Sequence, residues 1–450
     1  MTRLVLTCLV LVVSMLFAPT ATAHAAGSVP SFDHIFVIVM ENKSYSQIIG
    51  NTTQAPYINQ LASQYGVATN YRGIAHPSLP NYLALIGGQT FGVRSDCTSC
   101  FLSGPDLAVD RLRPAGRTWK GYMDGMPRPC FVGDSGRYRQ KHNPFIYFDH
   151  IRNTPAECAR SVPFSQLGVD LQRTSTTPNF VFITPDHCND MHDCPIRTGD
   201  DWLRGVVPTI LGSRAYREQN SLVVLTWDED DFTALNHIPT IVVGKQVPTG
   251  YRSAVPYTHY SLLRTIEAAW GLAPLTANDA SARTMSDFFT RTLEPVADTF
   301  ILRSSPNFTA AGSGTALQAT GAGLATALLR FDLRSIAGHG IESATLRLHT
   351  SSDSWAGSTS TFDLWLVRSD QWQERFVSYN NSVPVSSTRL GTLVAPRNPH
   401  SWYATRLSPS VVQSQVGGGL SFAIRGRLDD MLKFDSRESA FPPELVLVLN

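Results

Sequence analysis

Four acidic residues in a row, residues 228–231, follow an apolar run at residues 221–227. A short continuous run rich in Val and Leu predicts a strand that is buried on both faces, as in a parallel sheet covered by helices. Ligands bind at the carboxyl ends of the strands in such open sheets. Carboxylates gathered there repel one another unless a cation neutralises them, so this stretch indicates either a site for a hard metal ion or an acidic surface turn.

A second group of candidates is Glu41, Asn42 and Ser78. Glu41 and Asn42 follow another apolar run at residues 34–40, which predicts a second buried strand with its own acid at the carboxyl end. Ser78 precedes an apolar helical run at residues 79–86, and a proline near the start of that run places Ser78 at or near the N-cap. Most such serines only cap the helix, but an oxygen at this position can also attack a phosphate held by the free N–H groups of the helix terminus.

Histidines supply a third group of candidates. Residues 186–193 carry three aspartates and two histidines next to two cysteines. Imidazole and carboxylate at short spacing suit a transition metal or a protonation role, and the alternative is a polar loop pinned by a disulfide. His142, His237 and His259 lie in other segments, and a structural role explains each of them taken alone.

The elements that must position these residues differ between the two halves of the chain. Up to about residue 290, strands alternate with helices: the apolar runs are residues 34–40, 179–184, 221–227 and 238–243, and a clear helical pattern covers residues 260–270. This alternation predicts an α/β fold with a doubly wound, mostly parallel sheet. Later alternating patterns, separated by Gly, Ser, Asn and Pro clusters, predict an all-β sandwich. We expect a catalytic domain at residues 27–295 and an accessory domain at residues 296–450.

The first 26 residues have the pattern of a secretory signal, with Arg3, an apolar core at residues 4–17 and small residues before the expected cleavage site. No later segment reaches the ~20 apolar residues of a membrane span. We therefore expect a secreted, extracellular protein. Its 43% hydrophobic and 16% charged residues are typical of a globular protein, and a net charge of +1 gives no electrostatic basis for binding nucleic acid.

Six cysteines follow the signal, and an even number in an exported chain favours disulfides over metal thiolates. Proximity along the chain suggests three pairs, although it leaves the connectivity open: Cys97–Cys100, Cys130–Cys158 and Cys188–Cys194.

Four motifs resemble, in this order, those of the bacterial phosphoesterase family: HIFVIVMEN at residues 34–42, HPSLPNY at 76–82, NDMHD at 189–193 and TWDE at 226–229. That family joins acid phosphatases and phospholipases C within the alkaline phosphatase superfamily, and the resemblance covers about residues 30–290. It implies that four residues hold a divalent cation, namely Glu41, Asn42, Asp228 and Glu229. Ser78, which would also touch that metal, is implied to be the nucleophile.

The resemblance also gives roles to the histidines. His192, with Asp190, corresponds to the superfamily's segment for a second metal or a substrate contact. His259 resembles the late histidine that precedes the superfamily's last helix. His142 and His237 fall in family-like segments and would serve the leaving group or the phosphoryl group.

The number and identity of the metal ions stay open at this point. Many two-metal members of the superfamily have an Asp-His pair where this chain has Asp228-Glu229, so the one-metal branch is the closer match and a second ion is in doubt. If two ions bind, Asp190, His192 and His259 become ligands. Oxygen ligands suit Ca²⁺, Mg²⁺ or Mn²⁺, whereas added histidines would suit Zn²⁺ or Fe.

The C-terminal half resembles exported β-sandwich modules of the DNRLRE type, through DTF at residues 298–300, LRFDL at 329–333, SATLRL at 343–348 and FDSRE at 434–438. That resemblance implies a contact with carbohydrate or the cell surface. Four tryptophans are candidate stacking platforms, although core packing explains them at least as well: Trp355, Trp365, Trp372 and Trp402.

We therefore expect a secreted, metal-dependent phosphoesterase that acts through a phosphoserine and is most similar to acid phosphatases. A phospholipase C acting on phospholipid headgroups is the alternative within the enzyme class. The alternative outside it is a surface-binding protein with a non-catalytic α/β domain. The complete set of expected metal ligands and the nucleophile favours the enzyme, because a decayed site is expected to lose at least one of them.

Overall fold

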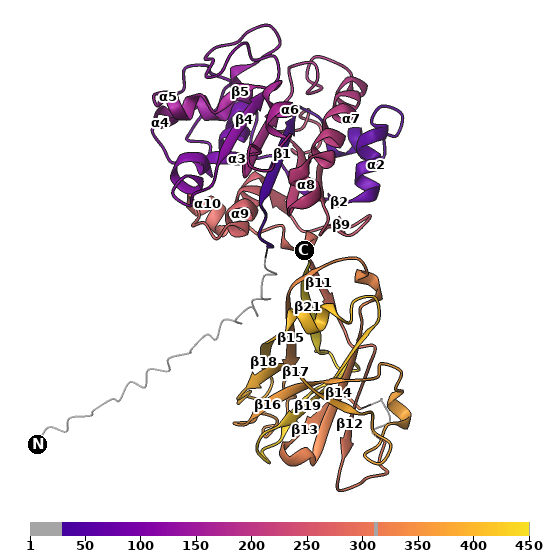
Figure 1. The fold of residues 1–450 in the computed structure, drawn as a ribbon. Helices are drawn as coiled ribbons and strands as arrows, with labels where there is room; N and C mark the ends of the chain where they lie inside the picture. The colour runs from indigo at the N-terminus through magenta and orange to yellow at the C-terminus, as the bar shows by residue number, and fades with distance from the viewer. Residues whose placement is uncertain (1–28, 310–313, 450) are drawn as a thin grey trace, which may run out of the picture.

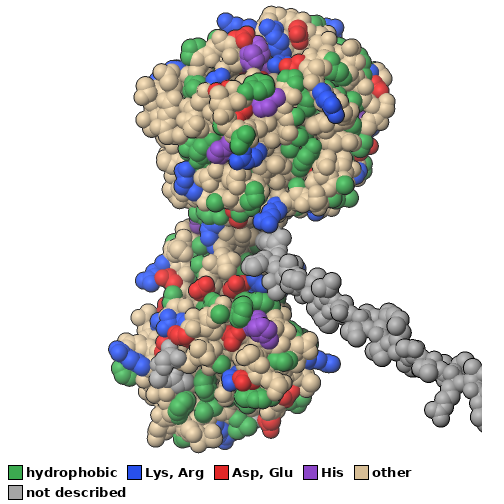
Figure 2. Space-filling model, turned by 180° about the vertical axis from the view of Figure 1, so that it is seen from behind, with side chains coloured by type: hydrophobic (Ala, Val, Ile, Leu, Met, Phe, Trp, Pro, Cys, Tyr) green, Lys and Arg blue, Asp and Glu red, His purple; other side chains and the backbone are tan. Residues whose placement is uncertain are grey.

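The computed structural model describes residues 29–309 and 314–449, so the expected secretory signal lies outside the described residues. The chain forms an α/β domain followed by an all-β domain, and a narrow waist separates the two (Figures 1 and 2). Acidic and basic side chains are interspersed on the face that Figure 2 shows. Among the described residues, no helix is both long and apolar enough to cross a bilayer.

The α/β domain is built on an eight-stranded sheet. Its strands, in spatial order, are β5 (Ser161–Pro163), β4 (Trp119–Met123), β6 (Phe180–Thr184), β1 (His34–Met40), β7 (Ser221–Trp227), β8 (Thr240–Gly244), β2 (Gly66–Ala68) and β9 (Arg252–Ser253). The central strand β1 is parallel to both of its neighbours, β6 and β7. Every residue of β1 and β7 is buried, so both faces of the sheet are covered, as their continuous apolar runs predict.

The strand expected at residues 238–243 corresponds to β8, which runs in the opposite direction to most strands of the sheet. β8 is antiparallel to β7, and β2 is antiparallel to β8. Residues 228–239, which connect β7 to β8, contain no helix that would carry the chain back to the start of the sheet. The sheet is therefore mostly, but not wholly, parallel.

Helices cover the sheet, with α3 packed on α9 and α2 on α7 (Figure 1). The helices of this domain are α1 (Tyr45–Ile48), α2 (Pro56–Gln64), α3 (Ser78–Gly87), α4 (Asp149–Arg152), α5 (Pro155–Cys158), α6 (Gln166–Asp170), α7 (Ile196–Gly212), α8 (Arg214–Glu218), α9 (His259–Ala269) and α10 (Ala277–Ser281). The helix expected at residues 260–270 corresponds to α9. Three disulfides join the pairs that sequence proximity suggests: Cys97–Cys100, Cys130–Cys158 and Cys188–Cys194.

The second domain is a nine-stranded, wholly antiparallel sheet with its own apolar core. Its strands, in spatial order, are β11 (Thr290–Leu293), β21 (Glu444–Leu449), β15 (Ile341–His349), β18 (Trp402–Leu407), β17 (Val385–Val394), β16 (Thr361–Val367), β19 (Gly419–Gly426), β14 (Ala325–Asp332) and β12 (Ala297–Leu302). A smaller pair, β13 (Ala316–Ala319) and β20 (Leu432–Asp435), and helix α11 (Pro409–Gln413) complete it. The sheet already includes β11, which precedes the boundary expected near residue 295.

Candidate active site

The central strands β1 and β7 end together, and this brings their polar residues to one edge. Met40 pairs with Trp227 at the end of the shared register, so Glu41 and Asp228 are the next residue of each strand. The Asn42 N–H donates to Asp228 Oδ1 at 3.2 Å. The Glu41 N–H donates to the Asp190 carbonyl oxygen at 3.0 Å, which ties the loop after β6 to the same edge.

Ser78 is the first residue of α3 and is 1% exposed. Its Oγ lies 3.0 Å from Glu41 Oε2 and 3.3 Å from Glu229 Oε1, within hydrogen-bond distance of both carboxylates. Lys141 Nζ donates to the same Oγ at 3.2 Å and to Asp96 Oδ2 at 3.0 Å. The serine oxygen therefore lies between two carboxylates and one ammonium, at the positive end of a helix.

Asp96 links this ammonium to the helix itself. Its Oδ1 accepts the N–H of Leu79, one of the N-terminal N–H groups of α3 that have no partner within the helix, at 3.0 Å. Lys141 lies in the 3₁₀ turn Gln140–His142, and Gln140 Nε2 donates to the Thr98 carbonyl oxygen between Cys97 and Cys100. The lysine and its partner Asp96 are thus held by two segments that are distant in sequence.

Glu41 is enclosed by polar and aromatic groups. Tyr82, one helical turn after Ser78, donates its hydroxyl to Glu41 Oε1 at 2.8 Å. His142 Nε2 lies 3.1 Å from the same oxygen, and its ring stacks on Tyr82 with 5.2 Å between centroids. Both Glu41 oxygens therefore face groups that favour its charged form.

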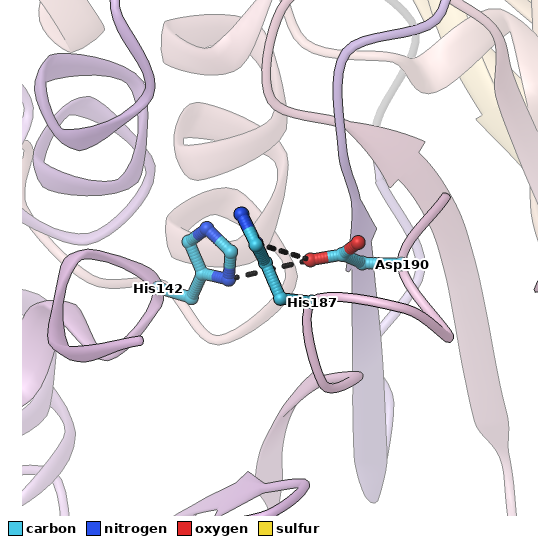
Figure 3. Close-up of side chains that lie close together, drawn as sticks. All are labelled: His142, His187 and Asp190. Atoms are coloured by element: carbon cyan, nitrogen blue, oxygen red, sulfur yellow. Dashed lines mark ion pairs between the residues drawn. The ribbon is translucent and has the colours of Figure 1, made fainter. Parts of the chain in front are cut away.

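Figure 3 shows a cluster of two histidines and one aspartate, of which His142 lies next to Glu41. His142 Nδ1 and His187 Nδ1 each lie 3.5 Å from Asp190 Oδ2. One donor atom from each of the three buried side chains lies within 4.8 Å of the other two, so the cluster is able to hold a metal ion. His192 stacks on His187 with 3.8 Å between centroids, and its Nδ1 lies 2.8 Å from Asp193 Oδ1.

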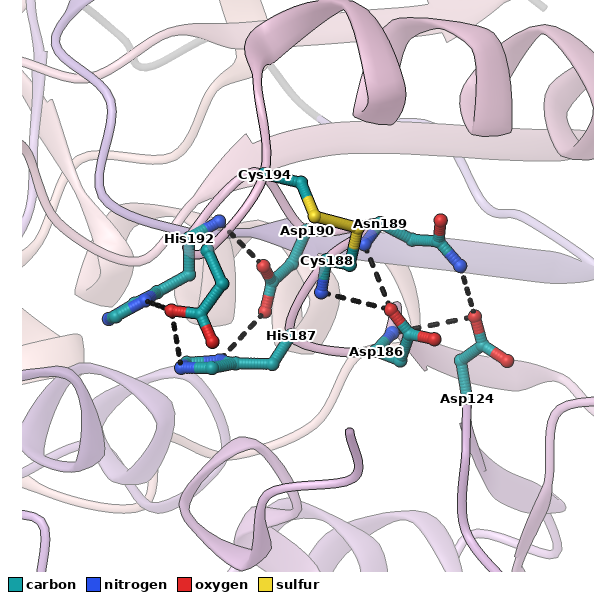
Figure 4. Close-up of a disulfide and its surroundings, with 9 residues drawn as sticks. Asp124, Asp186, His187, Cys188, Asn189, Asp190, His192 and Cys194 are labelled. Atoms are coloured by element: carbon teal, nitrogen blue, oxygen red, sulfur yellow. Dashed lines mark hydrogen bonds and ion pairs between the residues drawn. A yellow bond between two sulfur atoms is a disulfide. The ribbon is translucent and has the colours of Figure 1, made fainter. Parts of the chain in front are cut away.

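The loop that carries His187, Asp190 and His192 is closed by the disulfide Cys188–Cys194 (Figure 4). Asp186 Oδ1 accepts the N–H groups of Cys188 and Asn189 at 2.9 Å each, which forms a tight turn. Asp190 Oδ1 accepts the N–H of His192 at 2.7 Å. Turn chemistry and the disulfide together direct Asp190 towards the end of β1.

Burial is the largest influence on the acids of the site. It raises the pKa values of Glu41, Asp228 and Asp190, and it raises the pKa of Glu229 to about 8, with neighbouring carboxylates adding to the effect in each case. Burial also lowers the pKa of His142 well below its usual range. Carboxylates held this close and this deep require a positive partner to remain ionised together.

The oxygen donors here fit a hard divalent cation. Asn42 Oδ1 and Asp228 Oδ2 are buried and have no hydrogen-bond partner among the described residues. A metal ion would satisfy both atoms, because Ca²⁺, Mg²⁺ and Mn²⁺ prefer carboxylate and amide oxygens. Among the described residues, Glu41, Asp228 and Glu229 do not form a group in which one carboxylate oxygen of each lies within 4.8 Å of the others. Their oxygens are therefore spaced more widely than the donor atoms of the histidine cluster.

Two of the expected site histidines have their ring nitrogens committed elsewhere. His259, at the start of α9, has Nε2 2.6 Å from the Asp228 carbonyl oxygen and Nδ1 3.2 Å from the Tyr71 hydroxyl. It supports the backbone behind Asp228, and burial lowers its pKa to about 4. His237 places Nε2 3.0 Å from the Thr69 carbonyl oxygen and stacks on an aromatic ring, so the structure does not bring it to Ser78.

The last two acids of the run after β7 have structural roles. Asp230 accepts the backbone N–H groups of Phe232, Ala234 and Asn236 and so shapes the loop that follows. Asp231 Oδ2 accepts from Gln47 Nε2 at 2.7 Å. Asp230 is fully buried, so this second half of the acidic run is not a surface turn, although its two carboxylates bond to the protein and not to the expected metal site.

Four further residues lie at the site, and the sequence predictions assigned none of them a role of its own: Asp96, Lys141, His187 and His76, whose Nδ1 lies 2.7 Å from Glu229 Oε2. Lys141 precedes a predicted residue, His187 lies in a predicted segment and His76 begins a family-like motif. No spacing pattern connects residues 78, 96 and 141, so their meeting could not be read from the chain.

The chain is similar to known proteins in both domains. Residues 51–273 match the phosphoesterase family, and residues 289–449 match carbohydrate-binding module family 96. The name expected for the second module, DNRLRE type, is not confirmed by this match.

Curated relatives match the first domain. A phosphatidylinositol-3-phosphatase of Mycobacterium tuberculosis is 36% identical over 270 residues, which are 59% of this chain and 85% of that protein. An acid phosphatase of Aspergillus fumigatus is 30% identical over 264 residues, 56% of this chain and 58% of that one, so the match spans less than two thirds of the fungal relative. Among solved structures, a protein of the alkaline phosphatase superfamily from Vibrio parahaemolyticus matches 61% of this chain and 76% of that chain at 12% identity with a TM-score of 0.41.

Proposed function

Because this chain belongs to the phosphoesterase family and is an acid phosphatase-like phosphoric monoester hydrolase, we propose that it is secreted and acts through a covalent phosphoserine at Ser78. One observation carries the proposal: the Ser78 oxygen is buried at the start of α3, within hydrogen-bond distance of two carboxylates and one ammonium. A serine with only a capping role does not need this combination of partners. Three disulfides support an oxidising, extracellular location.

The first step is attack of Ser78 Oγ on phosphorus. The bond between phosphorus and the ester oxygen breaks, and the serine proton passes to Glu41 or Glu229, the two acceptors at 3.0 and 3.3 Å. Lys141 holds the phosphoryl oxygens as negative charge develops on them. The product of this step is a phosphoserine and an alcohol.

Protonation of the leaving oxygen falls to His192. It is the partly exposed member of the imidazole group. Burial lowers the pKa of His192, and the Asp193 carboxylate at its Nδ1 partly opposes that shift. Water then attacks the phosphoserine and gives one proton to His192. The bond from phosphorus to Oγ breaks, Ser78 regains its proton from the carboxylate that took it, and inorganic phosphate leaves.

Glu41, Asn42, Asp228 and Glu229 would hold one divalent metal ion, which supplies positive charge to the phosphoryl oxygens. The buried oxygens without partners support this set. The cluster around Asp190 joins His142 and His187, whereas His259 is committed elsewhere. A second ion at Asp190, His192 and His259 is therefore not part of the proposal.

We propose soluble phosphate monoesters as the main substrates, as the name acid phosphatase implies for the fungal relatives. The name of the mycobacterial relative adds the phosphate monoester of a phosphoinositide headgroup. Phospholipase C cleavage is distinguishable on phospholipid vesicles, because it releases a phosphorylated headgroup instead of inorganic phosphate. We also propose that the second domain binds carbohydrate, on the basis of its family match.

Hydrolysis of p-nitrophenyl phosphate by Ser78→Ala tests the mechanism. We expect turnover to fall by at least roughly 1,000-fold, because the nucleophile is lost while binding and metal content remain. Ser63→Ala, which replaces a serine whose Oγ bonds only within α2, is the matched control and should keep full activity. Mass spectrometry of acid-quenched wild type should find the phosphoryl group on Ser78. A Ser78→Ala protein with wild-type turnover would overturn the assignment.

A further inference from the structure

A cavity of about 680 Å³ opens in the second domain, away from the phosphoesterase site. Side chains from β15, from the start of β18, from the start of β21 and from three connecting segments line it. A volume of this order accommodates a small organic ligand such as one or two sugar units. The residues that matter are Arg347, His349, His400, Trp402, Phe441 and Glu444.

Aromatic rings form one side of the cavity. Phe441 is 39% exposed, and its ring lies 4.4 Å from that of His349. His400 packs edge-on against both of these rings, at 5.6 and 4.9 Å, and Trp402 lies 5.2 Å from His349. The rings brace one another, so an apolar surface is held in place at little further cost in side-chain entropy.

Polar groups line the same cavity. His349 is buried and its Nδ1 lies 2.6 Å from Asp435 Oδ2, which leaves Nε2 as the ring nitrogen free to face a ligand. Arg347 pairs with Glu444, and its guanidinium carbon lies 4.6 Å from the centroid of the Trp402 ring. The guanidinium and carboxylate offer planar, paired hydrogen-bonding edges at fixed positions.

We propose that this cavity is the saccharide-binding site of the second domain, an inference that rests on the proposed carbohydrate-binding function. A sugar ring has an apolar face of C–H groups and a rim of hydroxyls. The braced aromatic rings match the face, and His349, Arg347 and Glu444 match the rim. Fixed rings and fixed polar edges reduce the ordering cost of binding.

The other expected tryptophan platforms are placed differently. Trp372 is buried and donates its ring N–H to Ser421 Oγ, so it belongs to the core. Trp355 is 52% exposed, but the Lys433 ammonium lies 4.8 Å from its ring centroid, and Trp355 does not line this cavity. Trp355 therefore provides an exposed aromatic control within the same domain.

Affinity electrophoresis of the full chain tests the proposal. The gels contain one polysaccharide each: hydroxyethyl cellulose, xylan, galactomannan or polygalacturonate. Wild type should be retarded by at least one of them. Phe441→Ala and His400→Ala, both at partly exposed loop positions, should each weaken that retardation at least roughly tenfold. Trp355→Ala should migrate as wild type.

The outcomes separate the two proposals. Retardation that Phe441→Ala and His400→Ala leave unchanged, or that Trp355→Ala abolishes, overturns the cavity as the site while carbohydrate binding stands. Wild type that no polysaccharide in the panel retards overturns the carbohydrate-binding function and the cavity with it. Thermal melting of each variant confirms that a changed migration does not come from unfolding.

Discussion

Replacing Lys141 with methionine removes an ammonium from the serine oxygen while keeping most of the side-chain volume. Nζ lies 3.2 Å from Ser78 Oγ, and the side chain is mostly buried. Two unit charges about 4 Å apart interact by about 4 kcal/mol at an effective dielectric constant of about 20. Removing one such donor from developing oxyanion charge typically costs about 2.7–4 kcal/mol in enzymes. At about 1.36 kcal/mol for each factor of ten, Lys141→Met should lower kcat roughly 100- to 1,000-fold.

The assay is steady-state hydrolysis of p-nitrophenyl phosphate, with metal content measured on the same samples. Lys120→Met is the matched control, because Lys120 of β4 pairs with Asp170 of α6 at 2.6 Å. Both variants lose one partly buried ion pair, so similar losses of stability are expected. Only Lys141→Met should lose kcat. A Lys141→Met protein with kcat within about threefold of wild type and unchanged metal content refutes the phosphoryl role of this lysine.

Two further predictions concern stability. Replacing Cys130 and Cys158 by serine removes a disulfide between residues 28 positions apart in sequence and should lower the free energy of unfolding by about 4 kcal/mol. The same replacement of Cys188 and Cys194, which are 6 positions apart, should lower it by about 2 kcal/mol. Activity should fall more for the second pair, because its loop carries His187 and His192. Urea unfolding and kcat measure the two effects, and the opposite order of activities contradicts this prediction. Burial, followed by a neighbouring carboxyl, raises the pKa of Glu267 to about 8 from its usual 4.5, so the folded state keeps a proton that the unfolded state releases. Stability should fall as pH rises between these two values, by at most about 1.4 kcal/mol per pH unit, and Glu267→Gln should remove this fall in thermal melts; parallel melting curves for the two proteins would count against the raised pKa.

The acid half of the candidate site could be predicted because short-range rules govern it. The apolar runs before Glu41 and Asp228 form adjacent parallel strands that end in register, so their next residues meet at one edge. Ser78 was expected at or near an N-cap and is the first residue of α3. In each case the residue's place follows from the element directly beside it in the sequence.

The histidines and the lysine are different, because contacts distant in sequence decide their roles. His237 and His259 lie in family-like segments, yet neither contacts Ser78 through these ring nitrogens. His237 Nε2 lies against the Thr69 carbonyl oxygen, and the two ring nitrogens of His259 lie against the Tyr71 hydroxyl and the Asp228 carbonyl oxygen. The presence of a histidine in the sequence does not reveal whether its ring will face a substrate or a backbone carbonyl. The direction of β8 escaped prediction for a similar reason, since an apolar run does not reveal which way its strand runs.

The carboxylates and the imidazoles of the site are held by different parts of the structure. The carboxylates lie at the ends of β1 and β7, which share seven consecutive register pairs, so the pairing of these two strands sets the spacing of the carboxylates. The imidazoles stand mainly on a loop that a disulfide and an Asp186 turn close locally. Carboxylates that bind a metal ion tolerate little displacement, whereas a proton donor must follow leaving groups of different size. Changes in residues 185–195 should therefore alter the choice of alcohol more than the attack on phosphorus, which depends on groups anchored to the sheet and to α3.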